Sequence, residues 1–354
     1  MNAPFAHQSP RARIASLACD RECARIDGFV TELGGSIFQS PRWLRAVEMG
    51  TGQRACGIVV EHLGAIIGWL PLTAISSPLF GRGLVSSGFG VRGGILADHD
   101  AGAKSLTRAA EEMAMRMACS SVELRGGTVP QRWTNWADRH ANFAGELAAD
   151  DDAQLLAIPR KQRAEVRKSL NPHLTVTVGN DASDRAAHYT IYCESVHNLG
   201  TPVFPRSLFD AMLDSFGDDA DILTVLHDGR PVASVLSFYH DGAVMPFWGG
   251  GRHAARALRA NERMYYELML HARHRGMTRF DFGRSKTGSG PYHYKKNWGF
   301  TPEPITHSLW TAPGHEPRDL DPGDASYARK IALWKRLPLP VANAIGPHIA
   351  RGLG

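Results

Sequence analysis

The sequence predicts an α/β protein made of two similar domains. Its 354 residues are enough for two hydrophobic cores, and 43% hydrophobic against 21% charged residues is typical of a globular chain. The second observation is an element order that occurs twice: helix, hairpin, further strand, helix, strand. We therefore expect a repeated α/β unit.

The first copy of this order is expected in residues 13–150, after a loose tail of residues 1–12. Ser40 and Pro41 are suited to begin its first helix, as N-cap and first helical residue. The other elements follow from hydrophobic spacing and turn residues: strands at 55–61 and 65–75 around a turn at 62–64, a glycine-rich strand and loop at 81–94, a helix at 104–118 and a strand at 121–125.

The second copy is expected in residues 153–312, after an acidic, small-residue stretch that marks the domain boundary. Its later helix has Met264, Leu268 and Ala272 on one face, with Asn261 as N-cap and Gly276 as the stop. The elements are a helix at 205–216, hairpin strands at 221–227 and 232–239, a strand at 243–248, a helix at 260–275 and a strand at 280–282.

The last three elements form a βαβ unit, which binds ligands beyond the carboxyl ends of its strands. The first strand ends in Trp248, Gly249 and Gly250, where backbone can approach a ligand closely. After the second strand, aromatic and cationic side chains alternate in what we expect to be a loop. The binding candidates in and beside this unit are Arg252, Asn261, Tyr265, Arg284, Lys286, Tyr292 and Tyr294. A merely basic, solvent-exposed loop is the alternative.

A basic segment at residues 160–168 carries five cations and one Glu. On a helix, Arg163, Arg167 and Lys168 share roughly one side. They predict a clamp for phosphates, with a solvated helix face as the alternative. His197 and Asn198, expected in a loop, are further binding candidates, although a lone His more often forms a structural hydrogen bond.

The bulk properties favour a soluble, cytoplasmic protein. The net charge of +5 is a mild bias, and the five cysteines are few, odd in number and scattered. The N-terminus has no apolar signal-like segment, and no apolar run is long enough to span a membrane. The sequence also contains no catalytic-triad order, P-loop or metal-ligand spacing. Residues 313–354 read as a linker and a basic, apolar tail that packs on its own domain, with peripheral membrane contact as the alternative.

Four segments carry a family resemblance: residues 160–168, 195–204, 280–286 and 294–300. The chain resembles the FemAB family of acyl and aminoacyl transferases, whose domains have the GNAT fold. More narrowly, it resembles the FemAB-related proteins that accompany exosortase (PEP-CTERM) systems in exopolysaccharide-producing bacteria. The resemblance implies two tandem GNAT-like domains, with mixed sheets flanked by helices and the site in the second domain.

The resemblance also implies a reaction: transfer of an activated acyl or aminoacyl group to an amine of a cell-envelope or exopolysaccharide precursor. The acceptor would be a small molecule, glycan or peptide, and no DNA or permanently bound cofactor is expected. Lys295 matches the family lysine and would stabilise the oxyanion. Asp281 is a candidate base, with pairing to Arg279 or Arg284 as the alternative.

The donor is expected to be acyl-CoA or aminoacyl-tRNA, and the latter would make tRNA a partner. The pyrophosphate loop of GNAT enzymes should lie near residues 251–261, but no glycine follows Gly251 there. This departure favours aminoacyl-tRNA, whereas Arg252, Arg256 and Arg259 could still hold the phosphates of CoA. A second function class is a non-enzymatic RNA or polyanion binder that keeps the fold and the cations.

Overall fold

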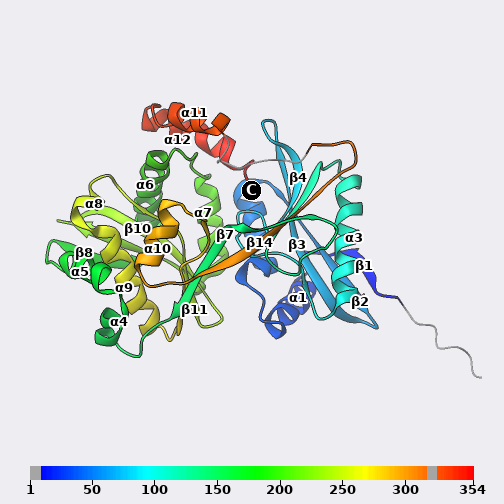
Figure 1. Ribbon diagram of the computed structural model, residues 1–354, viewed down its shortest axis with the longest axis horizontal. Coiled ribbons are helices and arrows are strands. Elements are labelled where there is room, and N and C mark those ends of the chain that lie inside the picture. The colour runs from blue at the N-terminus through cyan, green and yellow to red at the C-terminus, as the bar shows by residue number, and fades with distance from the viewer. Residues whose placement is uncertain (1–8, 317–324) are drawn as a thin grey trace, which may run out of the picture. The chain divides into compact units, whose positions relative to one another are not determined.

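The computed structural model describes residues 9–316 and 325–354 (Figure 1). The chain divides into two compact units. The first comprises Met1–Ala137, Thr306–Leu320 and Arg351–Gly354, and the second comprises Asp138–Ile305 and Asp321–Ala350. The fold is mixed α/β, as predicted.

The division lies at Ala137, before the predicted boundary at residues 150–153. The reason is the pairing of strand β7 (Thr134–Glu146): its residues 140–141 and 144–146 pair with β13 and β12, which belong to the second unit. The predicted tail is also divided, because residues 321–350 lie in the second unit and the last four residues in the first. The predicted superposition of the two copies stays a prediction.

The first unit is a mixed sheet in the order β1-β2-β3-β4-β6-β14, antiparallel except between β4 and β6. The predicted hairpin is confirmed, since β2 and β3 flank a turn in which Leu63 and Gly64 both have positive φ. The strands are β1 (Arg11–Ile14), β2 (Arg54–His62), β3 (Ala65–Ser77), β4 (Gly81–Ser86), β5 (Leu96–Ala97) beside β3, β6 (Ser121–Arg125) and β14 (Pro302–Thr311).

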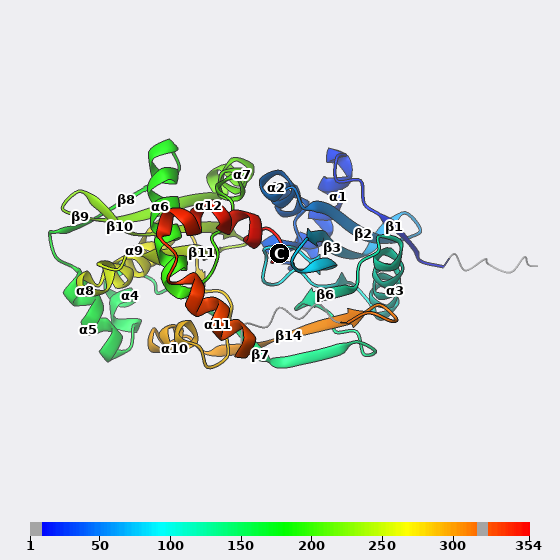
Figure 2. The same cartoon turned by 90° about the horizontal axis from the view of Figure 1, so that it is seen from above.

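Helices cover both faces of this sheet: α1 (Asp20–Glu32) and α2 (Pro41–Thr51) one face, and α3 (Asp100–Arg116) the other (Figure 2). Alternation along β2 explains the two cores. Val59 packs with Trp69 and residues of α1 and α2, whereas Ile58 and Val60 pack with residues of α3. The Ser40 hydroxyl accepts a hydrogen bond from the Arg42 backbone N–H, so the predicted N-cap of α2 is confirmed.

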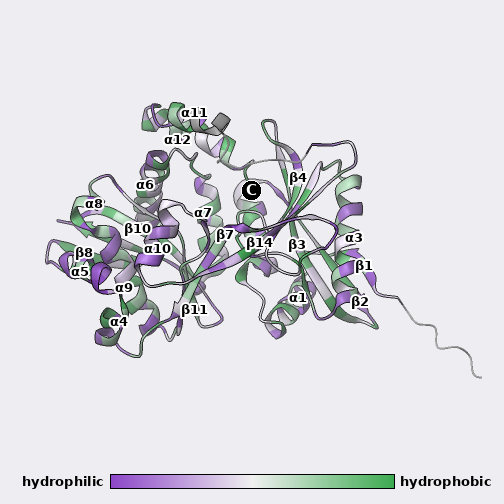
Figure 3. Cartoon of the chain, in the orientation of Figure 1, coloured by the Kyte–Doolittle hydropathy of each residue, from purple (hydrophilic) through white to green (hydrophobic). Residues whose placement is uncertain are grey.

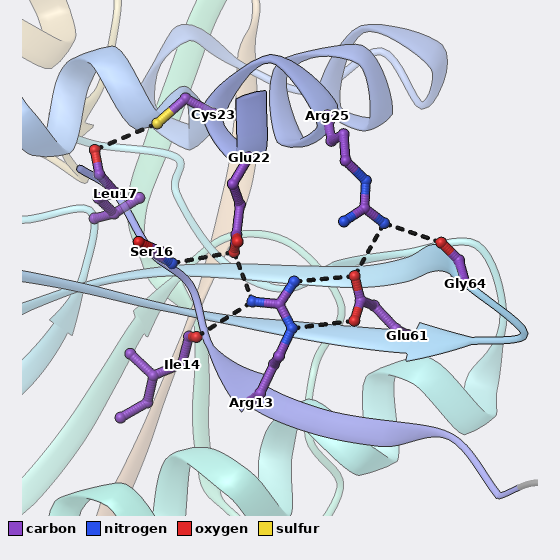
Figure 4. Close-up of polar contacts among 9 residues, drawn as sticks. All are labelled: Arg13, Ile14, Ser16, Leu17, Glu22, Cys23, Arg25, Glu61 and Gly64. Atoms are coloured by element: carbon purple, nitrogen blue, oxygen red, sulfur yellow. Dashed lines mark hydrogen bonds and ion pairs between the residues drawn. The ribbon is translucent and has the colours of Figure 1, made fainter. Parts of the chain in front are cut away.

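An ion-pair network ties the first strand of this unit to α1 and β2 (Figure 4). The Arg13 guanidinium donates to Glu22 at 2.7 Å and to both Glu61 oxygens at 3.0 Å. Arg25 of α1 adds a second cation 2.9 Å from Glu61. The hydrogen bond from Arg13, ahead of that from Arg25, lowers the pKa of Glu61. Because every charge here has a partner, the network is best explained as structural.

Gly94 is a position where the first unit tolerates no side chain. A Cβ there would lie 1.8 Å from the Gly126 carbonyl oxygen, and its next nearest neighbours are also backbone atoms. We expect Gly94→Ala to lower the free energy of unfolding by roughly 1–3 kcal/mol or more, as overpacking does.

Gly28 is the matched control for this variant. It is exposed within α1, and a Cβ added there would have no neighbour within 4 Å. Gly28→Ala should therefore be neutral or stabilising by about 1 kcal/mol. Urea unfolding of both variants measures the difference, and equal effects would contradict it.

The second unit has the strand order β7-β12-β11-β10-β9-β8, with β13 beside β7. β11 and β12 are parallel and are joined through helix α9, so the predicted βαβ unit is confirmed. The strands are β8 (Leu174–Gly179), β9 (Ala220–His227), β10 (Arg230–His240), β11 (Ala243–Gly251), β12 (Arg279–Asp281) and β13 (Ser285–Lys286).

The helices of the second unit lie on both faces of its strands (Figure 2), with α6 and α7 on one face and α4, α5 and α9 on the other. Gly276 ends α9 with φ +83°, as predicted. The helices are α4 (Asp151–Ala157), α5 (Arg160–Ser169), α6 (Ala182–Leu199), α7 (Arg206–Phe216), α8 (Ala255–Leu258), α9 (Ala260–His274), α10 (Gly290–Asn297), α11 (Ala325–Trp334) and α12 (Leu339–Ala350).

Three local predictions in this unit are wrong. The expected loop after the last strand contains β13 and helix α10, because Ser289 caps a helix by accepting from the Tyr292 N–H and is followed by Gly290-Pro291. Asn261 is not an N-cap, because the one-turn helix α8 precedes α9 and Arg259 takes the cap position. His197 and Asn198 lie at the end of α6 rather than in a loop, which begins at Gly200 (φ +84°).

The predicted packing of the tail on its own domain is confirmed for α12, which packs against α6. No helix among the described residues combines the length and the apolar character that a membrane span needs. The five cysteines are all free thiols, and only Cys19 is exposed.

Candidate active site

The two parallel strands of the second unit separate at their carboxyl ends. β11 and β12 pair at only two positions, Ala243 with Arg279 and Val244 with Phe280. Beyond them β11 continues along β10 as far as Gly251, whereas β12 follows β7. The Phe282 N–H donates to the Phe143 carbonyl of β7 at 2.7 Å. This divergence leaves the backbone of β11 after Val244 without β12 as a partner, which is where a βαβ unit binds ligands.

Several elements meet at the first turn of α9, which is close to the carboxyl end of β11. Arg259, in the left-handed region at φ +56°, forms an ion pair at 2.5 Å with Glu165 of α5. Glu262 accepts a hydrogen bond from the Tyr294 hydroxyl of α10 at 3.4 Å. A Cβ at Gly251 would lie 2.8 Å from Asn261 Oδ1, so the end of β11 is also close. The first turn of α9 therefore connects α5, β11 and α10.

Buried polar atoms in this region that have no hydrogen-bond partner among the described residues include Asn261 Oδ1 of α9 and Gln162 Nε2 of α5. An unpaired buried polar atom costs about 1–3 kcal/mol, so such atoms cluster where a ligand or water completes them. One is an acceptor and the other a donor. Their positions, at the start of α9 and on the neighbouring α5, favour a polar ligand there.

An aromatic cluster supports the other side of the divergence. Tyr265 of α9 stacks edge-on against Phe282, with ring centroids 4.6 Å apart, and lies 6.0 Å from the Tyr294 ring and 6.2 Å from the Trp298 ring. Burial raises the pKa of Tyr265 to about 12, with the charge of Glu262 adding to it. Tyr265 and Tyr294, both predicted to bind substrate, therefore form one wall with their hydroxyls protonated at neutral pH.

Lys295 of α10 is half-buried beside this wall. Its ammonium donates to the Gly283 carbonyl at 2.9 Å and to the Arg284 carbonyl at 3.1 Å, and lies between the Phe143 and Phe282 rings, 5.6 and 5.4 Å from their centroids. Burial lowers its pKa to about 7; the charge of Asp281 opposes that shift and the charge of Arg284 adds to it. A purely structural capping role would also place the ammonium against two carbonyls.

Asp281, the candidate base, is 8% exposed and is engaged by other groups. Its Oδ1 accepts hydrogen bonds from Asn142 Nδ2 at 3.0 Å and from the Gly283 N–H at 3.0 Å. Arg279, one of its expected partners, instead pairs with Asp241 at 3.0 Å. The sequence analysis did not identify Asn142 as a site residue. It lies beside Asp281 because β7 pairs with β12.

Other predicted residues of the α10 region lie nearby. Tyr292 packs edge-on against Phe143, with centroids 5.2 Å apart, and Lys296 Nζ lies 5.9 Å from the centroid of the Tyr292 ring. Arg284 contributes its carbonyl to Lys295, whereas Lys286 is exposed in β13. The structure thus brings Lys295, Asp281, Tyr265, Tyr292 and Tyr294 into one region.

The predicted residues at the end of β11 have structural contacts. Trp248 is 5% exposed and packs in an aromatic core, 4.9 Å from the Phe209 ring centroid. A Cβ at Gly249 would lie 2.9 Å from Val235 and one at Gly250 2.1 Å from the Ser195 hydroxyl, so both glycines accommodate neighbouring side chains. Arg252 lies 3.8 Å from Glu194. These contacts explain the tryptophan and the glycines without a ligand.

The basic segment at residues 160–168 is a helix, as predicted. Val166 on its inner face is buried, and so is Ile158 just before the helix. Arg163 donates to the Leu156 carbonyl at 2.8 Å, and Lys168 donates to Glu165 at 2.6 Å. Arg167 is exposed. Since Glu165 also holds Arg259, α5 is fastened to the start of α9 and its cations border the same region.

His197 and Asn198 belong to a different part of the unit. His197 Nε2 lies 3.0 Å from the Leu337 carbonyl, in the connection between α11 and α12, and Asn198 is exposed. The structural alternative for this histidine, a hydrogen bond that fixes the chain, accounts for its contact. Within the described part of the chain, no three His, Cys, Asp or Glu side chains are arranged to hold a metal ion.

Comparisons with known proteins support the assignment of the fold. Residues 159–296 match the sequence model of the family described as acetyltransferase (GNAT) domain, a range that contains β11, α9, β12 and Lys295. No curated protein matches the chain. The second unit therefore contains a region that is similar to GNAT acetyltransferase domains.

Solved structures share the fold over most of the chain. FemX is 16% identical, covers 82% of this chain and 96% of its own length, and has a TM-score of 0.63. A tandem GNAT protein from the clavulanic acid biosynthesis pathway is 10% identical over 87% of this chain and 100% of its own, with a TM-score of 0.58. The C-terminal domain of a protein described as a putative lysylphosphatidylglycerol synthetase, from Agrobacterium fabrum, is 13% identical over 84% and 93%, with a TM-score of 0.55. At these identities the shared property is the fold, and the predicted GNAT architecture is confirmed.

Proposed function

We propose that the second unit is an N-acyl or aminoacyl transferase of the FemAB type. The observation that carries this proposal is the ammonium of Lys295 beside the divergence of β11 and β12. An ammonium has three N–H donors, and the Gly283 and Arg284 carbonyls use two of them. The third can stabilise the oxyanion that forms when an amine attacks an activated acyl group.

The acceptor in this proposal is an amine of a cell-envelope or exopolysaccharide precursor, a glycan or a peptide. The structural likeness to FemX and the resemblance of residues 280–286 and 294–300 support it. Five free cysteines fit a reducing compartment, so we place the reaction in the cytoplasm, where activated donors are made.

The donor is an activated acyl group that presents phosphates to the first turn of α9. GNAT domains generally use acyl-CoA, and the match to that domain supports this donor. The chain departs from a glycine-rich loop, since the one-turn helix α8 fills residues 255–258. This departure supports aminoacyl-tRNA as the second donor to test. Asn261 Oδ1, buried and unpartnered among the described residues, is a polar contact that either donor could complete.

The test uses the purified full chain with each donor separately. The acceptors are a panel of amino sugars and of peptides that have a free amino group. Release of free CoA thiol reports acyl-CoA use, and loss of the aminoacyl ester reports aminoacyl-tRNA use. Amine-dependent consumption of either donor supports the proposal. Salt-dependent RNA binding without consumption of either donor would replace it with the polyanion-binding function.

The basic helix offers a prediction about donor binding. If Arg163, Arg167 and Lys168 touch phosphates, reversing all three to Glu should weaken donor binding. The slope of log affinity against log salt should flatten by roughly 0.7–0.9 for every phosphate that α5 no longer neutralises. The matched control reverses three positions of α3, Lys104, Arg108 and Arg116. A folded α5 variant with the affinity and salt slope of the control would return these cations to the solvated-face interpretation.

A further inference from the structure

The two C-terminal helices of the second unit form a hairpin with one face packed and one face open. Ala342, Gly346 and Ala350 are the buried residues of α12, spaced four apart. A Cβ on Gly346 would lie 3.1 Å from the Val203 backbone N, so this face packs closely through small residues. This face of small residues is therefore used by the fold, and a partner can reach only the remaining sides of α12.

The open side of the hairpin exposes aliphatic side chains. Val341 and Ile345 lie one turn apart on α12 and are 45% and 41% exposed, and Leu333 near the end of α11 is 66% exposed. Figure 3 colours much of both helices as apolar. Isolated exposed aliphatic residues are ordinary, but here three of them fall between Leu333 and Ile345, in one helix–connection–helix segment.

Cations accompany these aliphatic side chains. Lys335 and Arg336 are exposed in the connection between the helices, next to Leu333. The sequence from Ser326 to Gly354 contains no Asp or Glu. The hairpin therefore combines exposed aliphatic groups with positive charge that no acidic residue of the same segment offsets.

Exposed aliphatic groups beside positive charge favour one kind of binding partner over the others. A second copy of the chain would bring the same cations together across a two-fold axis, which like-charge repulsion disfavours. A nucleic acid would use the cations but leave the aliphatic groups in water. An anionic bilayer surface uses both, because aliphatic side chains enter the boundary of the acyl chains while Lys and Arg remain among the headgroups.

We propose that the α11–α12 hairpin docks the protein on the surface of an anionic lipid bilayer. His197 fixes the connection from beneath, through its contact with the Leu337 carbonyl, and so holds Lys335 and Arg336 at the surface. The attachment is peripheral, since the helices are short and α12 stays packed on α6 through its buried face. It does not depend on the proposed transferase reaction.

The test is sedimentation of the full chain with vesicles of phosphatidylcholine alone and vesicles that also contain phosphatidylglycerol. We expect binding to the anionic vesicles only. Lys335→Gln with Arg336→Gln should lower the partition coefficient roughly tenfold or more. Val341→Ser with Ile345→Ser should lower it by a similar factor, because two aliphatic groups no longer leave water.

Matched controls separate this surface from general charge and hydrophobicity. Arg108→Gln with Arg116→Gln removes two exposed cations of α3, and Leu63→Ser with Leu79→Ser removes two exposed aliphatic groups of the first unit. Both controls should bind vesicles as the wild type does. Thermal melts should be unchanged in all four variants, because the altered side chains are exposed.

Four results would overturn the proposal. They are absence of vesicle binding by the wild type, equal binding to neutral vesicles, equal losses in the controls, or binding of RNA with no binding of lipid. A dimer in solution that Val341→Ser with Ile345→Ser dissociates would instead assign this face to a second copy.

Discussion

Lys295→Met is expected to lower kcat of the proposed transfer about 100- to 1,000-fold, the usual cost of one oxyanion-stabilising donor. The ammonium would act only when charge develops, so KM should change little. Met keeps much of the volume between the Phe143 and Phe282 rings but cannot donate to any carbonyl. Turnover of whichever donor the protein consumes is the measurement.

Two further variants separate this role from a purely structural one. Lys296 is exposed one residue later on α10, so Lys296→Met should keep near-wild-type turnover. Lys295→Arg keeps a positive charge and should restore part of the rate. If Lys295 only caps the Gly283 and Arg284 carbonyls, Lys295→Met would lower the melting temperature while the surviving folded protein kept its kcat.

The depressed pKa of Lys295 gives this prediction a pH dependence. Its pKa is about 7 in the folded protein against an ordinary 10.5. The charged form that stabilises an oxyanion is therefore lost as pH rises through about 7, and this step should be absent in Lys295→Arg, whose guanidinium stays charged. Between about pH 7 and pH 10 the unfolded chain binds more protons at this residue. Stability should accordingly rise with pH over that window in the wild type, by more than in Lys295→Met.

The elements of the second unit were predictable where hydrophobic spacing and turn residues agreed. The strand, helix and parallel strand around α9 followed from residues four apart on one face and from Gly276, which the structure confirms. The helix α10 was missed because its residues are Gly, Pro, aromatic, or polar and charged, with no aliphatic period. Only its Ser289 cap and Pro291 pointed to a helix start.

The candidate site was predictable only in part, because it depends on contacts between distant segments. Tyr294 stood out through the local alternation of aromatic and cationic residues, and Lys295 stood out also through its match to the family lysine. Asn142 did not, since an Asn within a polar strand has no local signal, and its bond to Asp281 spans 139 positions. Trp248 is a different case: an aromatic residue before glycines suggested a binding surface, whereas its side chain packs in the core beside Phe209.

Asp221→Ala is expected to destabilise the second unit by about 3–5 kcal/mol, the cost of removing one partner from a buried ion pair. Asp221 is 7% exposed at the start of β9. Its carboxylate accepts from the Tyr239 hydroxyl at 2.9 Å and from Arg275 Nη1 at 3.0 Å, and lies 2.9 Å from His271 Nε2. The Arg275 guanidinium also stacks on the Tyr239 ring, 3.8 Å from its centroid. Without the carboxylate, the Arg275 guanidinium keeps only the Asp218 carbonyl and the Tyr239 ring as partners, and the buried Tyr239 hydroxyl loses its acceptor.

Asp241→Asn is the control for this network, because Asp241 also pairs with an arginine of the second unit, Arg279, at 3.0 Å, and Asn is suited to its φ of +46°. Its side chain is 73% exposed, so loss of its charge should cost at most about 1 kcal/mol. Asp221→Asn keeps the volume and removes only the charge, and should fall between the two. Hydrogen exchange of the α9 and β10 amides, measured beside urea unfolding, assigns the destabilisation to this unit. Equal effects of Asp221→Asn and Asp241→Asn would show that burial does not strengthen the Asp221 network, and that β9, β10 and the end of α9 are held together by their apolar contacts alone.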